Sequence, residues 1–280
     1  MPSPISLQNR HTSENSPIWE TDPLGEYRWI NIEGPLSRLA DALWIFGEGG
    51  RKVSTQILVP HWKLCLAVVR RWNVATSELE DVNLSVLGPV KNPRRNEGQS
   101  GLEIVAVRLH PEAAGDILDI KPIDIVDHDP MFEQWRGLGR VRQLAENGAP
   151  ANDVGQALLG YLQSRLTDAT GHIGQPAAGA RIIRQSLGLR RIKTVADELN
   201  IPERTFRRRF ELDIGLSPKQ YARRVRLMSL LLQTDQMAKP NWSGVAHDFG
   251  YFDQAHMIED MRDLAGIGLS SLHKMRRGII

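Results

Sequence analysis

Apolar positions along the chain change their spacing near residue 112. Between residues 36 and 111, short apolar runs are separated by Gly, Pro and Asn, which is typical of β-strands joined by turns. The strands expected from these runs are residues 43–46, 56–59, 64–69, 84–87 and 102–109. Many short strands at this spacing predict a compact β-sandwich or barrel.

Helical periodicity follows this strand-like region. The helices expected there are residues 113–120, 132–147 and 153–166. The last of them repeats apolar residues at three- and four-residue intervals, which is the spacing of one helix face. We expect these helices to cover the sheet or to pair two copies of the chain.

The last hundred residues are predicted to be helical throughout. Expected helices are residues 180–187, 194–199, 203–213 and 218–233, with a fifth from Trp242 and a sixth after Asp253. Ser217 and Asp253 are suited to cap the helices that follow them, and Gly215 and Gly266 to end the helices that precede them. In the segment 218–233 an apolar stripe predicts one buried face; it consists of Tyr221, Val225, Met228 and Leu232.

These patterns predict an α+β chain in two folded parts. Residues 1–25 lack apolar periodicity and are expected to form a tail, and residues 26–166 to form the β-rich domain with its helices. Residues 167–179 hold three Gly and a Pro and are the expected linker to a helical domain at residues 180–280. No apolar run is long enough to span a bilayer and no secretory signal is present, so the expected location is the cytoplasm.

Charge is distributed unevenly between these parts. The net charge is only +2, but residues 181–280 hold 18 of the 35 basic and 11 of the 33 acidic residues. Within them, residues 181–226 carry a net +8 and residues 227–280 a net −1. Charge runs are usually solvated faces, yet this one places any attraction to phosphate at the first part of the helical domain.

A helix-turn-helix pattern lies in that basic segment. Residues 195–210 read as a helix, a tight turn and a helix that is rich in arginine. Phe206 and Phe210 are four residues apart and are expected to face inward, which leaves Arg204, Arg207 and Arg208 to face outward. A guanidinium on such a helix can bond the O6 and N7 atoms of guanine together in the major groove. The pattern repeats about fifty residues later, from Val245 to Met261.

The two units, the long helix between them and the segment Gly215-Leu216-Ser217-Pro218-Lys219-Gln220-Tyr221 resemble the DNA-binding domain of AraC/XylS-type transcription regulators. The resemblance covers about the last hundred residues. It implies that two reader helices of one monomer enter successive major-groove faces, about one helical turn or 34 Å apart. By matching to the family motif, the base-reading positions are Arg204, Arg207 and Arg208 in the first unit and Gln254, Ala255 and Glu259 in the second. Candidate phosphate contacts are Arg191, Lys219, Arg223 and Arg224.

The second unit departs from the family pattern. Glu259 stands where arginine is common, and Met261 replaces the usual phenylalanine. A glutamate repels phosphate but can accept a hydrogen bond from cytosine N4, so a base preference and a weakly binding unit both remain open. In the first unit, Pro202 stands where serine commonly caps the reader helix. Gly268-Leu269 replaces the usual Thr-Pro or Ser-Pro pair after the second unit.

The amino-terminal half is similar to β-rich sensor-like domains that are attached to some members of this family. Those domains bind a small effector, dimerise, or do both. Candidate effector-pocket residues are Trp44, Trp62, Trp72 and Arg108. Aromatic residues and arginine on strands are more often simple core or satisfied ion pairs.

Catalysis is not expected. Asp127-His128-Asp129 beside Pro130 is typical of a turn, and His61 and His110 alone do not complete a metal site. Cys65 is the only cysteine, so cysteine metal clusters and the chemistry of a cysteine-dependent repair methyltransferase are excluded. The run Gly47-Glu48-Gly49-Gly50 lacks the lysine and helix of a phosphate-binding loop. We therefore expect no enzyme activity, metal or cofactor.

The sequence predicts a sequence-specific DNA-binding transcription regulator, for which the family resemblance favours an activator. Expected partners are double-stranded DNA, RNA polymerase, a small-molecule effector and a second copy of the chain, with no membrane. The alternative is a ligand-binding or protein-interaction module whose helical tail binds DNA weakly or not at all.

Overall fold

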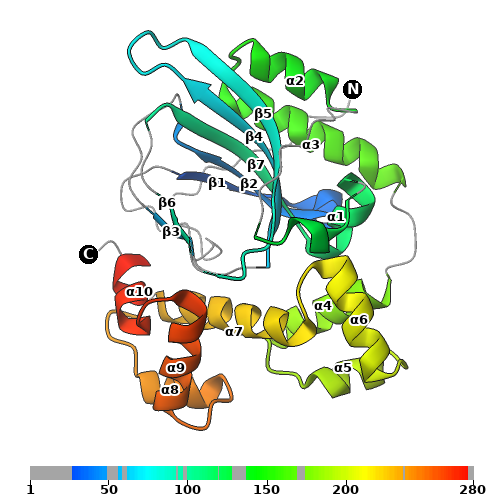
Figure 1. The fold of residues 1–280 in the computed structure, drawn as a ribbon, viewed down its shortest axis with the longest axis vertical. Helices are drawn as coiled ribbons and strands as arrows, with labels where there is room; N and C mark the ends of the chain where they lie inside the picture. Colours follow the sequence, from blue (N-terminus) through cyan, green and yellow to red (C-terminus); the bar gives the residue numbers. More distant parts are fainter. Residues whose placement is uncertain are drawn as a thin grey trace.

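The structure, a computed structural model, describes residues 27–48, 56–58, 62–92, 94–96, 100–118, 120–127, 137–168, 174–235 and 237–276. Its amino-terminal part is built on an antiparallel sheet, and its carboxyl-terminal part consists of helices (Figure 1). The chain is thus of the α+β class, as the sequence predicts.

Five strands form the main sheet in the order β1-β2-β7-β4-β5. Their bounds are Tyr27–Asn31 (β1), Ala40–Phe46 (β2), Leu102–Leu109 (β7), Leu64–Trp72 (β4) and Leu79–Leu87 (β5). A separate pair joins β3 (Gln56–Leu58) to β6 (Arg94–Asn96). Within the described residues β1 and β5 are opposite edges of an open sheet, so of the two expected alternatives, a sandwich or a barrel, the closed barrel is excluded. The short strands β1 and β6 were not among the strands expected from apolar runs.

The main sheet is apolar on both faces, which explains why its strands read as nearly continuous apolar runs. Leu66 and Val107 lie on the face that forms one core with the helices α2 (Gly139–Glu146) and α3 (Ala151–Asp168). Figure 1 shows these two helices covering that side of the sheet. Trp29, Trp44 and Ala106 lie in a separate cluster on the opposite face. Residues 132–136 of the helix expected at 132–147 lie outside the described residues, and α2 corresponds to the carboxyl-terminal part of that helix.

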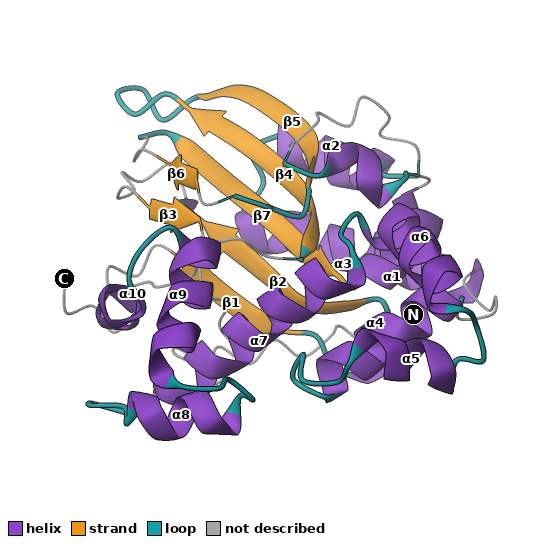
Figure 2. Ribbon diagram, turned by 60° about the horizontal axis from the view of Figure 1, so that its bottom comes forward, coloured by secondary structure: helices purple, strands orange, loops and turns teal. Residues whose placement is uncertain are grey.

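Seven helices follow in the described carboxyl-terminal part. Their bounds are Gln175–Gln185 (α4), Ile192–Glu198 (α5), Glu203–Ile214 (α6), Pro218–Asp235 (α7), Trp242–Asp248 (α8), Gln254–Ala265 (α9) and Leu269–Arg276 (α10). Figures 1 and 2 show α7 as the long helix between α4–α6 on one side and α8–α10 on the other. The order matches the sequence prediction, except that α10 was not expected.

The predicted helix signals are present. The Ser217 hydroxyl accepts from the backbone N–H of Gln220 (3.3 Å), and the Gln220 side chain accepts from the N–H of Ser217 (3.1 Å), which is a reciprocal capping box. Asp253 accepts from the N–H of His256 (2.8 Å) and caps α9. Gly215 and Gly266 adopt the left-handed conformation, with φ of 83° and 70°, after α6 and α9.

One core joins both helix-turn-helix units, and it also takes in a residue of the amino-terminal part. Phe210 makes an edge contact with Tyr221 of α7, with ring centroids 5.4 Å apart. The ring of Trp62, which precedes β4, also makes an edge contact with Tyr221, with ring centroids 5.7 Å apart. Because Tyr221 is fully buried and contacts both rings, it joins the helical part to the sheet domain.

A second contact between the two parts lies at the end of α6. The 3-10 helix η3 (Pro122–Ile125) and α1 (Pro111–Leu118) both contact α6. A Cβ added to Gly215 would lie 2.7 Å from the carbonyl oxygen of Pro122. Glycine is therefore required at this position by the close approach as well as by its positive φ.

No helix among the described residues has the length and apolar content needed to cross a membrane.

Close packing of α4 against α6 leads to a test with an internal control. A Cβ added to Gly179 would lie 2.5 Å from the buried ring of Phe206, whereas one added to Gly160 in α3 would meet nothing within 4 Å. We expect Gly179→Ala to lower the free energy of unfolding by about 1–3 kcal/mol because the ring has no room to shift. Gly160→Ala should raise it by up to about 1 kcal/mol through helix propensity. Urea unfolding of both variants checks this, and equal effects would contradict the tight contact.

Candidate nucleic-acid interface

The first helix-turn-helix unit consists of α5, a turn and α6. Asn200 in the turn has a φ of 53°, a left-handed conformation that asparagine tolerates better than most residues. Phe206 and Phe210 are fully buried and contact each other edge to face, with centroids 5.3 Å apart. This contact fixes the rotation of α6 about its axis, so that the opposite side faces outward.

The arginines of α6 lie on that outward side. Arg204, Arg207 and Arg208 are exposed, as their spacing predicts. Arg207 is ion-paired with Glu203 one turn earlier, through its Nε at 2.8 Å. Arg204 and Arg208 form no hydrogen bond or ion pair with the part of the chain that the structure describes. An exposed i,i+4 pair contributes only about 0.3–0.5 kcal/mol, so Arg207 can exchange Glu203 for another acceptor at little cost.

Arg209, on the flank of the same helix, differs from the other three. Its guanidinium donates to the side-chain oxygen of Gln175 at the start of α4 (2.9 Å). Arg209 is therefore oriented toward α4.

A basic hollow lies between the two units and is bordered by α5, α6, α7 and α9. Three of the four predicted phosphate contacts, Arg191, Lys219 and Arg223, line it. The charged side chains around it are Arg190, Arg191, Lys193, Arg207, Lys219, Arg223 and Arg226 against Glu203 and Asp260. This excess of positive charge favours a polyanion on this side of the helical part.

Arg223 is held by the second unit. Its guanidinium forms ion pairs with Asp260 (2.6 Å) and Asp263 (2.7 Å), both on α9. Asp260 also accepts a hydrogen bond from the hydroxyl of Tyr251 (2.8 Å). Arg223 thus joins α7 to the second reader helix, and phosphate would have to compete with two carboxylates for it.

Arg224 does not lie in the hollow, which corrects its prediction as a phosphate contact. It is 4% exposed and donates to the carbonyl oxygens of Val90 (3.3 Å) and Lys91 (2.9 Å) in the amino-terminal part. Burial lowers the pKa of Arg224 to about 10, with a further contribution from the charge of Arg223. The apolar stripe on α7 predicted which face packs on the helical core, but it contained no information about a second contact with the sheet domain.

The second unit presents a different outward surface. Met257 and Met261 are buried, and Gln254, Ala255 and Glu259 are exposed, in the orientation expected from the repeat. None of these three exposed residues is basic. Arg262 in the last turn is the one arginine or lysine of α9, so the second reader helix is less cationic than the first.

The four candidate effector-pocket residues do not line one pocket. Trp62 belongs to the helical core, and Trp72 lies under the guanidinium of Arg70, 5.2 Å from the ring centroid. Trp44 and Arg108 lie closer together, because Trp44 is the register partner of Trp29 and Arg108 lies 4.3 Å over the Trp29 ring. The sequence could not distinguish pocket residues from core residues here, because strand periodicity does not indicate which end of a strand approaches another domain.

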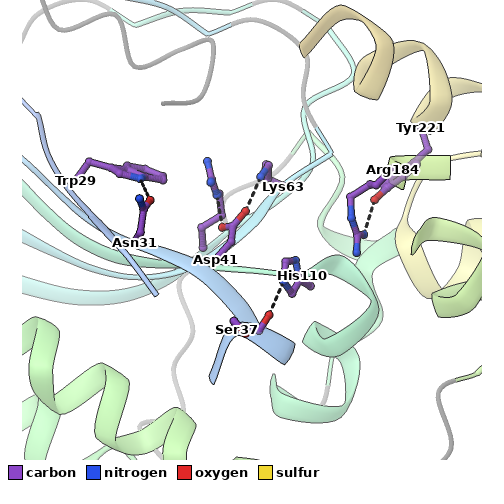
Figure 3. A network of polar contacts seen from close by, with 9 residues as sticks. Trp29, Asn31, Ser37, Asp41, Lys63, His110, Arg184 and Tyr221 are labelled. Carbon is purple, nitrogen blue, oxygen red and sulfur yellow. Dashed lines mark hydrogen bonds and ion pairs between the residues drawn. The ribbon is translucent and has the colours of Figure 1, made fainter. Parts of the chain in front are cut away.

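Asp41 and Lys63, which Figure 3 labels, form a partly buried charge network with Arg108 that sequence patterns did not reveal. Asp41 accepts from the Nε of Arg108 (2.5 Å) and from the Nζ of Lys63 (2.9 Å). Burial favours the neutral form of Asp41, but the charges of Arg108 and Lys63 outweigh it and hold the pKa of Asp41 well below its usual range. The Nη1 of Arg108 is buried and has no hydrogen-bond partner within the described residues.

Lys63 connects this network electrostatically to the helical part. Burial lowers the pKa of Lys63 to about 8, and the positive charges of Arg108 and of Arg184 on α4 contribute, while Asp41 opposes them. Arg184 donates to the hydroxyl of Tyr221 (2.9 Å), as Figure 3 shows. Positive charge from both parts of the chain thus meets near the Trp62–Tyr221 contact.

The turn containing Asp127 has a structural role in the described residues. The Asp127 side chain accepts from the N–H of Lys91 (2.7 Å), next to the carbonyls that hold Arg224. His128, Asp129 and His61 lie outside the described residues. The described part of the chain contains no group of three His, Cys, Asp or Glu side chains that could hold a metal ion.

The burial of Arg224 can be tested against its earlier assignment. We expect Arg224→Met to lower the free energy of unfolding by about 1–3 kcal/mol because two buried carbonyls lose their donor. Lys219→Met, on the exposed side of the same helix, should change it by less than about 0.5 kcal/mol. Urea unfolding followed by circular dichroism measures both. A stable Arg224→Met with a shallower salt dependence of DNA binding would restore the phosphate assignment.

Comparison with known proteins adds a family match. Residues 195–275, which contain both units, match a family model described as a helix-turn-helix domain. No curated protein matches the chain in sequence.

Among solved structures, the fold is similar to that of ToxT from Vibrio cholerae. One crystal form is 9% identical, covers 80% of this chain and 96% of its own, and has a TM-score of 0.42. ToxT bound to (E)-4-(8-methylnaphthalen-1-yl)but-3-enoic acid is 10% identical, with 81% of this chain and 97% of the ToxT chain covered and a TM-score of 0.44. ToxT from strain SCE256 bound to an unsaturated fatty acid is 8% identical, with 81% of this chain and 93% of the ToxT chain covered and a TM-score of 0.42.

The buried faces, the repeated turn and the family match agree over the carboxyl-terminal part of the chain. Residues 195–275 form an AraC-type helix-turn-helix domain.

Proposed function

We propose that this chain is a sequence-specific transcription regulator in which α6 reads bases in the major groove. The observation that carries the proposal is the orientation of α6: Phe206 and Phe210 are buried, while Arg204 and Arg208 are exposed and have no partner among the described residues. Long donors on the exposed side of a recognition helix suit the acceptor pairs on guanine. Arg207 joins them when it leaves Glu203.

The basic hollow supports a separate role in affinity. Arg191 and Lys219 line it and form no described hydrogen bond or ion pair, so we assign them to phosphate. Such contacts position a protein on DNA without reading its sequence. Arg223 contributes indirectly, because its ion pairs hold α9 against α7.

For the second unit, we assign Gln254, Ala255 and Glu259 to the bases that α9 meets. Their exposure on the amino-terminal half of the helix supports this assignment. Glu259 would accept from cytosine N4. With fewer donors than α6, α9 should contribute less affinity.

For the amino-terminal part, we propose binding of an effector that carries an anionic group. The network of Asp41, Lys63 and Arg108 holds one carboxylate against two cations, and the Nη1 of Arg108 is unpaired. Arg184 adds positive charge from the helical part, so an anion here would contact both domains. The family resemblance supports activation, with RNA polymerase as a partner, and pairing of two copies through the amino-terminal half.

The competing function is an interaction module that no longer binds DNA well, which Glu259 and the net −1 of residues 227–280 would favour. Salt dependence separates the two functions. DNA affinity should fall steeply with salt as phosphates are neutralised, with a slope of about −0.9 per contact. Binding of a protein or neutral ligand need not do so.

Base reading by α6 is tested by selection from random duplex DNA, followed by titration of the recovered site. We expect Arg207→Ala to weaken the cognate site by about 1–3 kcal/mol and to relax one base position. Arg204→Ala with Arg208→Ala should degrade the motif further. Arg209→Ala is the matched control, since it removes the same charge from the flank and should weaken all sequences alike. Recovery of no motif by the wild type at any salt would favour the interaction module.

The effector proposal is tested with a series of monocarboxylates of increasing chain length, using their methyl esters as uncharged controls. We expect an acid, but not its ester, to raise the thermal midpoint of the chain and to change its affinity for the selected site. Arg108→Gln should abolish both responses because the unpaired guanidinium N–H is lost. Equal responses to acid and ester would argue against an anionic site.

A further inference from the structure

Phe252 is the most exposed large apolar side chain among the described residues, at 93%. It lies immediately before α9, the second reader helix, and next to Asp253, which caps that helix. Its backbone is therefore held at a defined point beside the first turn of α9.

This exposure departs from the usual packing at a helix start. An apolar residue before the N-cap commonly packs against the fourth residue of the helix. In α9 that fourth residue is Met257, which is fully buried, while Phe252 stays outside. At the equivalent place in the first unit, Ile201 is partly buried and packs against the helical core.

Phe252 is not needed to anchor the turn, because its neighbour does this. Tyr251 is buried, and its hydroxyl donates to Asp260 (2.8 Å). The guanidinium of Arg226 lies over the Tyr251 ring, 5.3 Å from its centroid, and also donates to the carbonyl of Gly188 (2.8 Å). With the turn secured in this way, the exposed ring of Phe252 remains available for a partner.

The surroundings favour DNA as that partner. Ala255 is exposed in the first turn of the same helix, so Phe252 and Ala255 together give α9 an apolar start. Residues at the start of a recognition helix reach base edges, where the C5 methyl group of thymine is the apolar feature of the major groove. His256, in the same turn, lines the basic hollow together with Arg191 and Lys219. The phosphate-attracting surface thus extends to this turn.

We propose that Phe252, with Ala255, reads thymine in the second DNA element through apolar contact with its C5 methyl group. The inference rests on the proposed function, and it gives the second unit a base preference that needs no arginine. The two reader helices would then recognise different bases: α6 reads guanine through hydrogen bonds, and α9 reads thymine through contact with its methyl group.

Replacement of thymine by deoxyuridine removes only the methyl group and keeps base pairing. In the site selected by the wild type, we substitute the thymines of the second element one at a time and measure affinity. We expect a loss of about three- to tenfold at one or two positions, on the scale of one buried methyl group. The same substitutions should cost Phe252→Ala less affinity than they cost the wild type, because only the contact with Ala255 is left, and Phe252→Leu should retain more of the discrimination.

Leu212→Ala is the matched control, because Leu212 is an exposed apolar residue near the end of α6. It should discriminate thymine from deoxyuridine as the wild type does. Thermal unfolding of Phe252→Ala should match the wild type, since an exposed ring contributes little to folding, so a loss of discrimination cannot come from misfolding.

The outcomes separate this inference from the function on which it rests. The thymine contact is wrong if the wild type selects a guanine-containing first element but no thymine in the second, or if it binds thymine and deoxyuridine equally. In both cases the proposed function as a transcription regulator is unaffected. If Phe252→Ala discriminates as well as the wild type does, Phe252 does not contact the thymine methyl group and the inference is overturned. If no DNA is selected at all, the proposed function itself fails.

Discussion

The structure depends on a buried cation that joins its two parts. Arg224 projects from α7 into the amino-terminal part, where the carbonyls of Val90 and Lys91 accept its hydrogen bonds. A buried guanidinium without such acceptors would be strongly destabilising, so α7 is stable only where these carbonyls are presented to it. The side chain of Asp127 holds Lys91 in place by accepting its N–H. The position of the long helix therefore follows from the conformation of the amino-terminal part.

The positions of both reader helices are set by their contacts with α7. Tyr221 contacts Phe210, which fixes α6, and Arg223 binds Asp260 and Asp263, which fixes α9. One contact is apolar and the other ionic, so the two helices are not held equally. Partly exposed ion pairs weaken with salt more than buried aromatic contacts do. A change in the amino-terminal part that moved α7 would move α6 and α9 together.

Most elements of the helical domain could be predicted from the sequence because their signals are local. Ser217, Asp253, Gly215 and Gly266 act within one helical turn of their own positions, and each lies where its chemistry requires. Strands were predicted less completely. β1 and β6 are short and lack a strong apolar run, and they form because β2 and β3 pair with them. The sequence left a sandwich and a closed barrel as alternatives, since nothing in a strand's own periodicity indicates how many neighbours it has.

The sequence alone determined the class of the carboxyl-terminal domain, the two units and the outward orientation of Arg204, Arg207 and Arg208, because helical periodicity fixes which residues share a face. Only the tertiary structure decided that Arg224 is buried, that Arg223 binds α9, that Trp62 belongs to the helical core and that Phe252 remains exposed. These outcomes depend on contacts between distant segments of the chain, such as Trp62 and Tyr221, which are 159 residues apart. A local pattern indicates whether a side chain is polar or apolar and which face it lies on. Which residue it contacts depends on the tertiary structure.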